Sequence, residues 1–129
     1  MKFKTPELME EFVQMPAMLQ VMAQWFEQLC IVHFGIDPTV TRIKETVPGS
    51  SGVHEAGRAI DFRDEHAGGR LFTDERVAFL VSQMNARFPG NDSKPTCIHH
   101  KFAGGPAHFH IQISSGDHYP ADLDCFTVV

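Results

Sequence analysis

Residues 108–113 alternate strictly between polar and large apolar side chains, and this alternation constrains the fold more than any other feature. Successive side chains on a β-strand point to opposite faces of the sheet. One face therefore carries three large apolar groups, Phe109, Ile111 and Ile113. The other face carries three polar groups, His108, His110 and Gln112. The pattern predicts a strand whose apolar face lies against the core and whose polar face is available for chemistry.

The N-terminal segment, residues 1–35, is predicted to be helical because its apolar residues recur at steps of three and four. Thr5 can cap the first helix, and Pro6 suits the first helical position. Pro16 interrupts the apolar face, so we expect a short helix followed by a longer one. We interpret the apolar stripe as core packing rather than as a partner-binding groove.

The rest of the chain predicts strands and one further helix. Residues rich in β-branched or alternating side chains predict strands at 39–47, 59–62, 96–102 and 107–114. Thr73 and the two acids after it open a helix that ends before Pro89. We therefore expect one α+β domain over residues 1–129: a small, mainly antiparallel sheet in region 39–114, with the N-terminal helices and the further helix packed on it. Residues 115–129 are expected to be an irregular tail.

Composition excludes several classes of protein. The chain has 129 residues and a formal net charge of −5, which argues against broad electrostatic binding of nucleic acid. No apolar run approaches the roughly 18 residues that a membrane span needs. The chain turns acidic at Glu7 before a signal-peptide core can form, so we expect synthesis in the cytoplasm. Its three cysteines, Cys30, Cys97 and Cys125, cannot all pair within one chain, which favours a reducing compartment.

Two separated groups of polar residues could share one metal ion. His54 is expected in a loop, and Asp61 lies between Ile60 and Phe62 on a short strand, so alternation turns its carboxylate away from the core. Two imidazoles and one carboxylate suit tetrahedral zinc with a fourth position open. Taken alone, Asp61 could equally cap a backbone amide, and the histidines of residues 108–110 could be solvated surface groups.

Together these segments resemble the signature of the LAS group of zinc peptidases. This group includes D-alanyl-D-alanine carboxypeptidases, the vancomycin-resistance dipeptidases and phage endolysins that cleave L-alanyl-D-glutamate bonds. Its signature is Ser-x-His-x-x-Gly-x-Ala-x-Asp, followed later by His-x-His or Glu-x-x-His. Four residues fall on this pattern, His54, Gly57, Ala59 and Asp61, whereas Ser51 lies one position further from the histidine. The resemblance covers about residues 40–114 and implies the fold shared by hedgehog signalling domains and DD-peptidases.

The resemblance implies that His54 and Asp61 bind Zn²⁺. In members with His-x-His the second histidine binds the metal, which favours His110 as the third ligand. A second alignment, to the His-Phe pair of the endolysins, would make His108 the ligand instead.

The identity of the general base stays open. The resemblance leads us to expect an acidic residue three positions before the last metal ligand, and this residue is absent. Gly105 and Ala107 occupy those positions in the two alignments. We expect His108 to be the base, with His99 or His100 as substitutes. His100 shares a strand face with Ile98 and Phe102, which indicates a packed core histidine. His99 shares its face with Cys97 and Lys101, which predicts the polar side and access to the metal if this strand pairs with the last one.

The LAS group also has an arginine upstream of its first histidine that binds the substrate carboxylate or the developing oxyanion. Arg42 and Lys44 are the candidates here, since both are expected to project from one face of strand 39–47. A solvated face with no role in binding is an equally good interpretation.

The resemblance implies a zinc-dependent metallopeptidase that hydrolyses peptidoglycan stem peptides or D-Ala-containing peptides. A phage-type enzyme, made in the cytoplasm and released onto the cell wall, fits the small size and the N-terminal sequence. The alternative is a catalytically silent zinc-binding structural or interaction module on the same fold, which the missing acid keeps open. A third interpretation is a protein that binds no metal, which would require both motifs to have arisen by chance.

Overall fold

The computed structural model describes residues 1–45, 52–90, 95–101 and 105–113. The helices in these ranges are α1 (Pro6–Val13), α2 (Ala17–Phe34) and α3 (Asp74–Arg87). The strands are β1 (Lys2–Phe3), β2 (Thr39–Arg42), β3 (Ala59–Arg63), β4 (Glu65–His66), β5 (Gly69–Arg70), β6 (Cys97–Lys101) and β7 (Ala107–Gln112). The predicted α+β class, with a mainly antiparallel sheet and helices packed on it, is confirmed.

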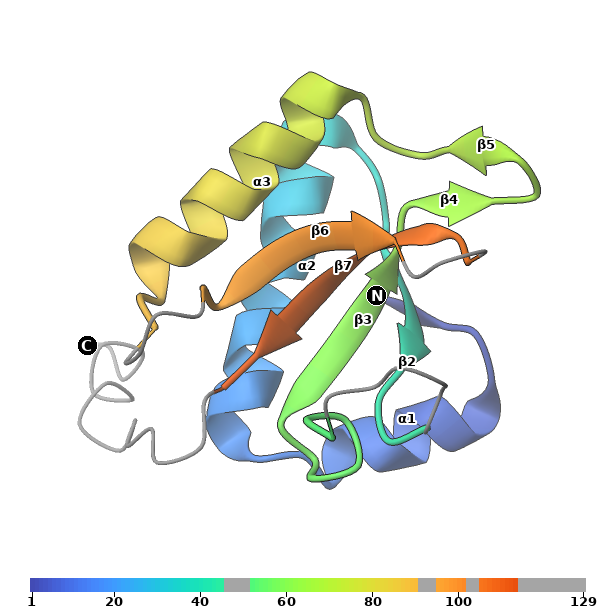
Figure 1. Cartoon of the computed structure of the whole chain (residues 1–129), viewed down its shortest axis with the longest axis vertical. Coiled ribbons are helices and arrows are strands. Elements are labelled where there is room, and N and C mark those ends of the chain that lie inside the picture. The colour runs from blue at the N-terminus through green and yellow to red at the C-terminus, as the bar shows by residue number, and fades with distance from the viewer. Residues whose placement is uncertain (46–51, 91–94, 102–104, 114–129) are drawn as a thin grey trace.

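Five strands form the main sheet in the order β1-β2-β3-β7-β6 (Figure 1). β1 runs parallel to β2, and every other neighbouring pair is antiparallel. β4 and β5 form a separate hairpin that projects at one edge of the molecule. β3 and β7 are neighbours in this order, and they carry two of the three predicted metal ligands, Asp61 and His110.

The helix boundaries follow the signals in the sequence. The Thr5 hydroxyl accepts a hydrogen bond from the Leu8 amide at the start of α1, and Pro6 is the first helical residue. Pro16 separates α1 from α2, as predicted. Gly35 ends α2 with φ of 65°, a left-handed conformation that glycine adopts without steric cost.

The apolar core lies between α2 and one face of the sheet. The ring of Phe26 on α2 lies 4.6 Å from that of Phe62 on β3 and 5.0 Å from that of Phe109 on β7. Ile60 and Ile111 are also fully buried on this side. The N-terminal apolar stripe joins the same core, as predicted, through Leu8, Phe12, Met15, Leu19, Met22 and Phe26.

A β-bulge decides which way β2 presents its side chains. Val40 pairs with Phe62, but Arg42 pairs with Asp61, so the register shifts between the two pairs. In a regular strand residues 40 and 42 would face the same side. The extra residue lets Val40 enter the core while Arg42 faces the opposite side of the sheet.

Several elements differ from the sequence expectations. The predicted strand 39–47 ends at Arg42, and residues 46–47 lie outside the described ranges. β1, β4 and β5 have two residues each, too few to show an alternating pattern in the sequence. Such short strands depend on pairing with their neighbours. The tail 115–129 and Cys125 also lie outside the described residues, and the single-domain organisation stays a prediction. Among the residues described, no helix has both the length and the apolar character needed to cross a membrane.

Cys30 and Cys97 are free thiols that are fully buried in the core. Burial raises the pKa of each thiol to about 12, and for Cys30 the carboxylates of Glu27 and Asp37 act in the same direction. Both side chains are therefore neutral at physiological pH and act as apolar packing groups rather than as metal ligands.

Candidate metal centre

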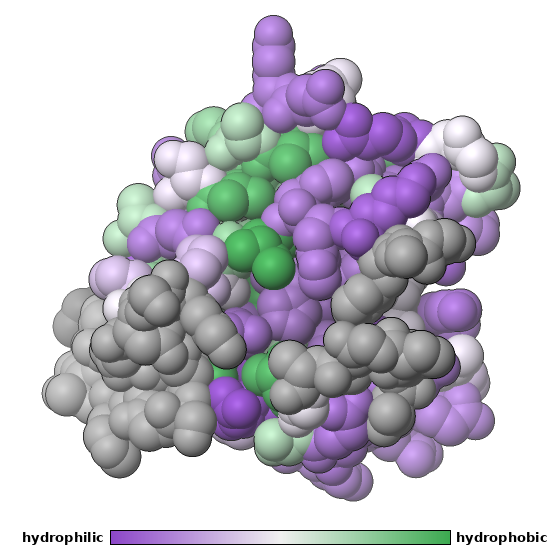
Figure 2. Space-filling model, in the orientation of Figure 1, coloured by the Kyte–Doolittle hydropathy of each residue, from purple (hydrophilic) through white to green (hydrophobic). Residues whose placement is uncertain are grey.

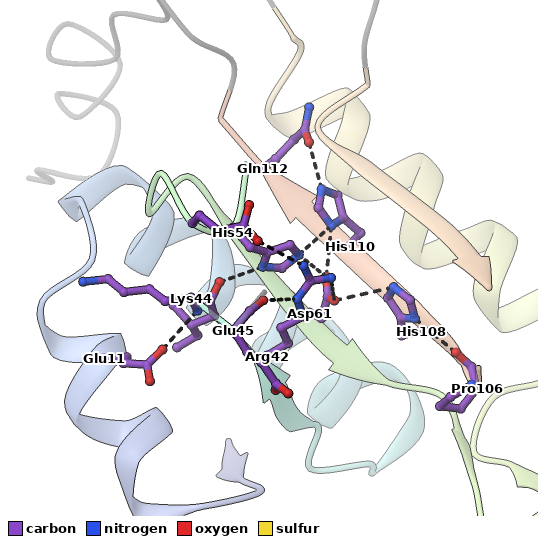
Figure 3. Close-up of polar contacts among 12 residues, drawn as sticks. Glu11, Arg42, Lys44, Glu45, His54, Asp61, Pro106, His108, His110 and Gln112 are labelled. Carbon is purple, nitrogen blue, oxygen red and sulfur yellow. Dashed lines mark hydrogen bonds and ion pairs between the residues drawn. The ribbon is translucent and has the colours of Figure 1, made fainter. Parts of the chain in front are cut away.

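The candidate centre lies on the face of the sheet opposite α2. Asp61 on β3 and His110 on β7 are direct cross-strand partners, which brings the carboxylate and the imidazole together. His54 reaches them from the loop that precedes β3 (Figure 3). All three residues are buried: Asp61 is 2% exposed, His110 7% and His54 2%. Figure 2 shows that this face of the molecule is mostly hydrophilic over the middle of the sheet, with apolar side chains towards α3.

A tight turn holds His54 over the strands. The Gly57 amide donates to the His54 carbonyl at 2.9 Å, and Gly57 has φ of 73°, which favours glycine there. Arg58 ties the end of the turn to β7, because its guanidinium donates to the Ile113 carbonyl at 2.8 Å. The backbone conformation of the turn therefore explains the glycine at position 57 of the motif. The hydrogen bond to Ile113 gives Arg58 a structural role.

Three ligand atoms converge in a nearly equilateral triangle. Asp61 Oδ1 lies 3.1 Å from His54 Nε2 and 3.0 Å from His110 Nδ1, and the two nitrogens are 3.2 Å apart. Ligands at about 2.0–2.1 Å from tetrahedral zinc are roughly 3.3 Å from one another. The triangle therefore has the size that a small tetrahedral ion requires, and this group could hold a metal ion.

Both imidazoles are held in the tautomer that a metal ligand needs. His54 Nδ1 donates to the Ile43 carbonyl at 2.7 Å, and His110 Nε2 donates to Gln112 Oε1 at 2.8 Å. Each ring therefore directs its other nitrogen towards Asp61, where it can donate a hydrogen bond to the carboxylate or, when deprotonated, offer its lone pair to a metal. Hydrogen bonds of this kind are usual behind metal-ligating histidines. The role of Gln112 was not predicted, although its position two residues after His110 is a usable signal.

The electrostatics of the triangle also fit a cation. Burial by itself would raise the pKa of Asp61, but hydrogen bonds from His110 and His54 hold it well below its usual range. The carboxylate is therefore ionised at any physiological pH. Three acceptor atoms this close together repel one another unless a positive charge lies between them. In the metal-free protein the hydrogen bonds between the imidazoles and Asp61 relieve this repulsion, and a metal ion could replace them.

His108 lies beside the triangle rather than in it. Its Nδ1 donates to the Pro106 carbonyl at 3.1 Å, and its Nε2 lies 3.5 Å from Asp61 Oδ2, the carboxylate oxygen outside the triangle. The group of converging ligand atoms contains His110 and not His108. Of the two alignments considered for the third ligand, the geometry favours the one that selects His110.

Arg42 and Lys44 lie in different environments, so the prediction that both project from one strand face is wrong. The buried guanidinium of Arg42 lies 3.8 Å from Asp61 Oδ2 and 3.7 Å from Glu55 Oε1. Lys44 follows the end of β2, and its exposed side chain points away from the triangle (Figure 3). Its backbone amide donates to Glu11 on α1. Binding of substrate by either residue stays a prediction.

The predicted faces of β6 are reversed. His99 pairs with Phe109, and its ring lies 5.0 Å from that of Phe109 on the core side. His100 pairs with His108 on the side of the metal centre, with ring centroids 4.4 Å apart. Burial, together with the neighbouring imidazoles, lowers the pKa of His100 to about 4, so this ring is neutral at pH 7. His100, not His99, is the β6 histidine next to the centre.

His99 belongs to a different polar cluster, which sequence reasoning missed. Its Nε2 lies 2.7 Å from Oδ2 of the fully buried Asp64, which also pairs with Arg70. The other carboxylate oxygen accepts the backbone amides of Leu71 and Phe72 at 3.1 and 3.0 Å. Asp64 therefore ties β6 to the base of the β4–β5 hairpin, and this cluster has a structural explanation.

No family model, curated protein or solved structure shows a significant match to this chain. The structure by itself shows that His54, Asp61 and His110 form a buried group that could hold a metal ion.

Proposed function

We propose that the protein is a zinc metallopeptidase that hydrolyses peptide bonds in peptidoglycan stem peptides or D-Ala-containing peptides. The observation that carries the proposal is the triangle of His54, Asp61 and His110, whose size, burial and tautomers suit a metal with an open coordination position. The substrate class comes from the resemblance of the motifs to the LAS peptidases. In this proposal the protein is made in the cytoplasm and acts on the cell wall after release.

The side chains divide the work of metal-assisted hydrolysis. Zinc, when bound by the triangle, would supply the Lewis acidity that polarises a carbonyl and acidifies water. His108 would carry the proton from water to the leaving amine, because its Nδ1 is held by Pro106 and its Nε2 is directed towards the site. Arg42 would hold the outer oxygen of Asp61 and, near the same point, a developing negative charge. His99 lies on the other face of the sheet, so we assign it no catalytic role.

The test is mass spectrometry of peptides released from purified sacculi, with and without a chelator. We expect chelator-sensitive release by the wild-type protein, and the new termini would identify the bond. His110→Gln should abolish release, whereas the matched change His66→Gln, at an exposed histidine of β4, should not. Intact sacculi from several wall types, with zinc bound to the protein, would contradict a peptidase.

A catalytically silent zinc module is the second candidate, because Gly105 and Ala107 occupy the positions where the LAS peptidases have an acid. It predicts one zinc ion per chain, a zinc-dependent rise in melting temperature and no release of peptides from sacculi. Release by the wild-type protein that disappears in His108→Ala, with zinc retained, would exclude this candidate.

A further inference from the structure

The outer face of α2, which points away from the sheet, carries no charged side chain. An α-helix turns about 100° per residue, so residues within about 60° of Gln28 share one face. From position 21 onward these are Val21, Gln24, Trp25, Gln28, Ile31 and Val32. The helix has one acid, Glu27, which binds the N-terminal amine, and it has no Lys or Arg. A surface helix normally presents charged residues to water, so this face resembles one that is buried against a partner.

Apolar side chains of this face are open to solvent. Trp25, Ile31 and Val32 are 38%, 41% and 71% exposed. A depression of about 240 Å³ on this face is lined by Trp25, Gln28, Leu29, Val32 and His33. Trp is among the residues that contribute most to the free energy of protein–protein association, above all where it enters a pocket of the partner. A face with both a bulky ring and a depression can therefore be complementary to a second copy of itself.

α3 lies beside α2, runs in the opposite direction and widens this face (Figure 1). The Trp25 ring lies 6.0 Å from that of Phe88 at the end of α3, and the Phe34 ring lies 5.7 Å from that of Phe79 in its first half. α2 is about 27 Å long, and packed helices are about 8–10 Å apart. Two such helices per copy can bury on the order of 1,000 Å² in total, which is about the lower limit for a specific interface.

The charges at the two ends of this face are opposite. At one end, the guanidinium of Arg87 lies over the Trp25 ring, 5.0 Å from its centroid. At the other end, where α2 stops and α3 starts, the exposed groups are the acids Asp37, Asp74 and Glu75 and the base Arg76. Arg70 also pairs with Asp74, but the buried Asp64 balances its charge. This second end is therefore net negative and is complementary to Arg87.

We propose that two copies of this chain associate symmetrically through the outer faces of α2 and the adjoining side of α3. The two-fold axis crosses α2 near Gln28, and the two α2 helices pack antiparallel. Trp25 of one copy then meets Val32 of the other, because these residues lie almost equally far from Gln28 in opposite directions. Arg87 of each copy lies beside the acidic end of the other. The metal centre is on the opposite face of the sheet from α2, so the association covers neither centre.

Sedimentation velocity of the full chain tests the proposal at protein concentrations from about 1 to about 300 µM. Interfaces of this size are weak, so we expect a monomer at the lowest concentration and mostly dimer at the highest. Gln28→Glu and Gln28→Lys should each weaken association at least about tenfold, because like charges meet at the axis. An equal mixture of the two variants should restore association, because opposite charges then meet. Gln14→Glu, the same change at an exposed glutamine after α1, is the matched control and should associate like the wild type.

Fluorescence gives a second measurement, because Trp25 is the only tryptophan of the chain and lies on this face. We expect acrylamide to quench its emission less at high than at low protein concentration, and Gln28→Glu to remove the difference. Neither measurement requires metal or hydrolysis, so both should give the same result with and without a chelator. The proposal therefore stands or fails separately from the peptidase, which is tested by peptide release.

Three results would overturn the proposal. The first is a wild-type chain that stays monomeric at every concentration; if its Trp25 is also shielded from acrylamide, another segment of the same chain covers the face. The second is association that persists unchanged in both Gln28 variants, which would place the contact elsewhere on the molecule. The third is a mixture of the two variants that stays monomeric, which would contradict a two-fold axis at Gln28.

Discussion

The two faces of the sheet use neighbouring residues of the same strands for different purposes. On β3 and β7, Phe62 and Phe109 pack against Phe26 of α2, while Asp61 and His110 point to the opposite side and meet His54. Both sets are buried. The apolar face gains free energy from leaving water, whereas the polar face buries a carboxylate and two imidazoles that need hydrogen bonds or a cation to offset their desolvation. Substitutions one residue apart should therefore separate stability from metal binding.

Phe109→Ala should have the largest effect, because it removes a fully buried ring that contacts Phe26 and Phe72. We expect the free energy of unfolding to fall by about 3–5 kcal/mol in urea titrations of the metal-free protein. Val32→Ala, on the exposed side of α2, is the control and should change it by less than about 0.5 kcal/mol. A small effect of Phe109→Ala would mean that this face is not the core.

Metal removal tests the polar face. At a free zinc concentration 100 times its dissociation constant, binding should stabilise the folded protein by about 2.7 kcal/mol, and a chelator should lower the melting temperature. Asp61→Asn should lose the zinc-dependent shift in differential scanning calorimetry while it keeps the fold. An undiminished shift in this variant would place the zinc somewhere other than the triangle.

Asp64 tests the polar cluster on the core side. Burial alone would raise the pKa of Asp64, but hydrogen bonds from His99, the Phe72 amide and Arg70 hold it below its usual range. Its contribution to stability is therefore complete above about pH 4–5 and is lost as the pH falls through the lowered pKa.

Asp64→Asn should cost about 1–3 kcal/mol at pH 7, since buried donors lose their charged acceptor. The difference from wild type should shrink towards pH 3, as measured by urea unfolding at both pH values. Zinc affinity should not change. A difference that grows on acidification would contradict a lowered pKa for Asp64.

Gln112→Leu should have the smallest effect of the substitutions considered. It tests whether a hydrogen bond behind a metal-binding histidine of the polar face affects zinc affinity. The amide oxygen fixes the tautomer of His110, so its loss should weaken zinc binding about tenfold, or 1.4 kcal/mol. Competition with a chromophoric chelator measures this change. Gln112→Glu should keep or raise the affinity, because a carboxylate makes the imidazole more basic. Equal zinc affinity in all three proteins would show that His110 needs no such partner.

Much of the fold and the metal centre follows from local patterns. Thr5, Pro16 and Gly35 mark helix boundaries through capping, a missing amide and a left-handed turn. The alternation around Asp61 and His110 separates core from polar face, because a strand has a period of two. The motif spacing also selects His54 and Asp61 and leaves the third residue between His110 and His108, and the pairing of β3 with β7 places His110 opposite Asp61.

Other features depend on partners distant in sequence. Each face of β6 carries both polar and apolar residues, so the strand's own sequence gives only a weak preference for one face. That preference predicted His99 as the exposed histidine, and this prediction is wrong. Pairing with β7 places His99 against Phe109 and His100 against His108. The neighbouring strand decides which face of this edge strand is buried. Burial of the apolar face of β7 contributes more free energy than the weak preference in the sequence of β6.

The sequence by itself determined the helix ends, the two faces of the central strands and two of the three converging residues, His54 and Asp61. These depend on backbone sterics and on the period of two, which act over a few residues. Only the tertiary structure decided the bulge that turns Arg42 towards Asp61, the partner that holds each imidazole and the choice of His110 over His108 as the third converging residue. Register between strands sets all of these, and it follows from the packing of the whole sheet rather than from any one segment.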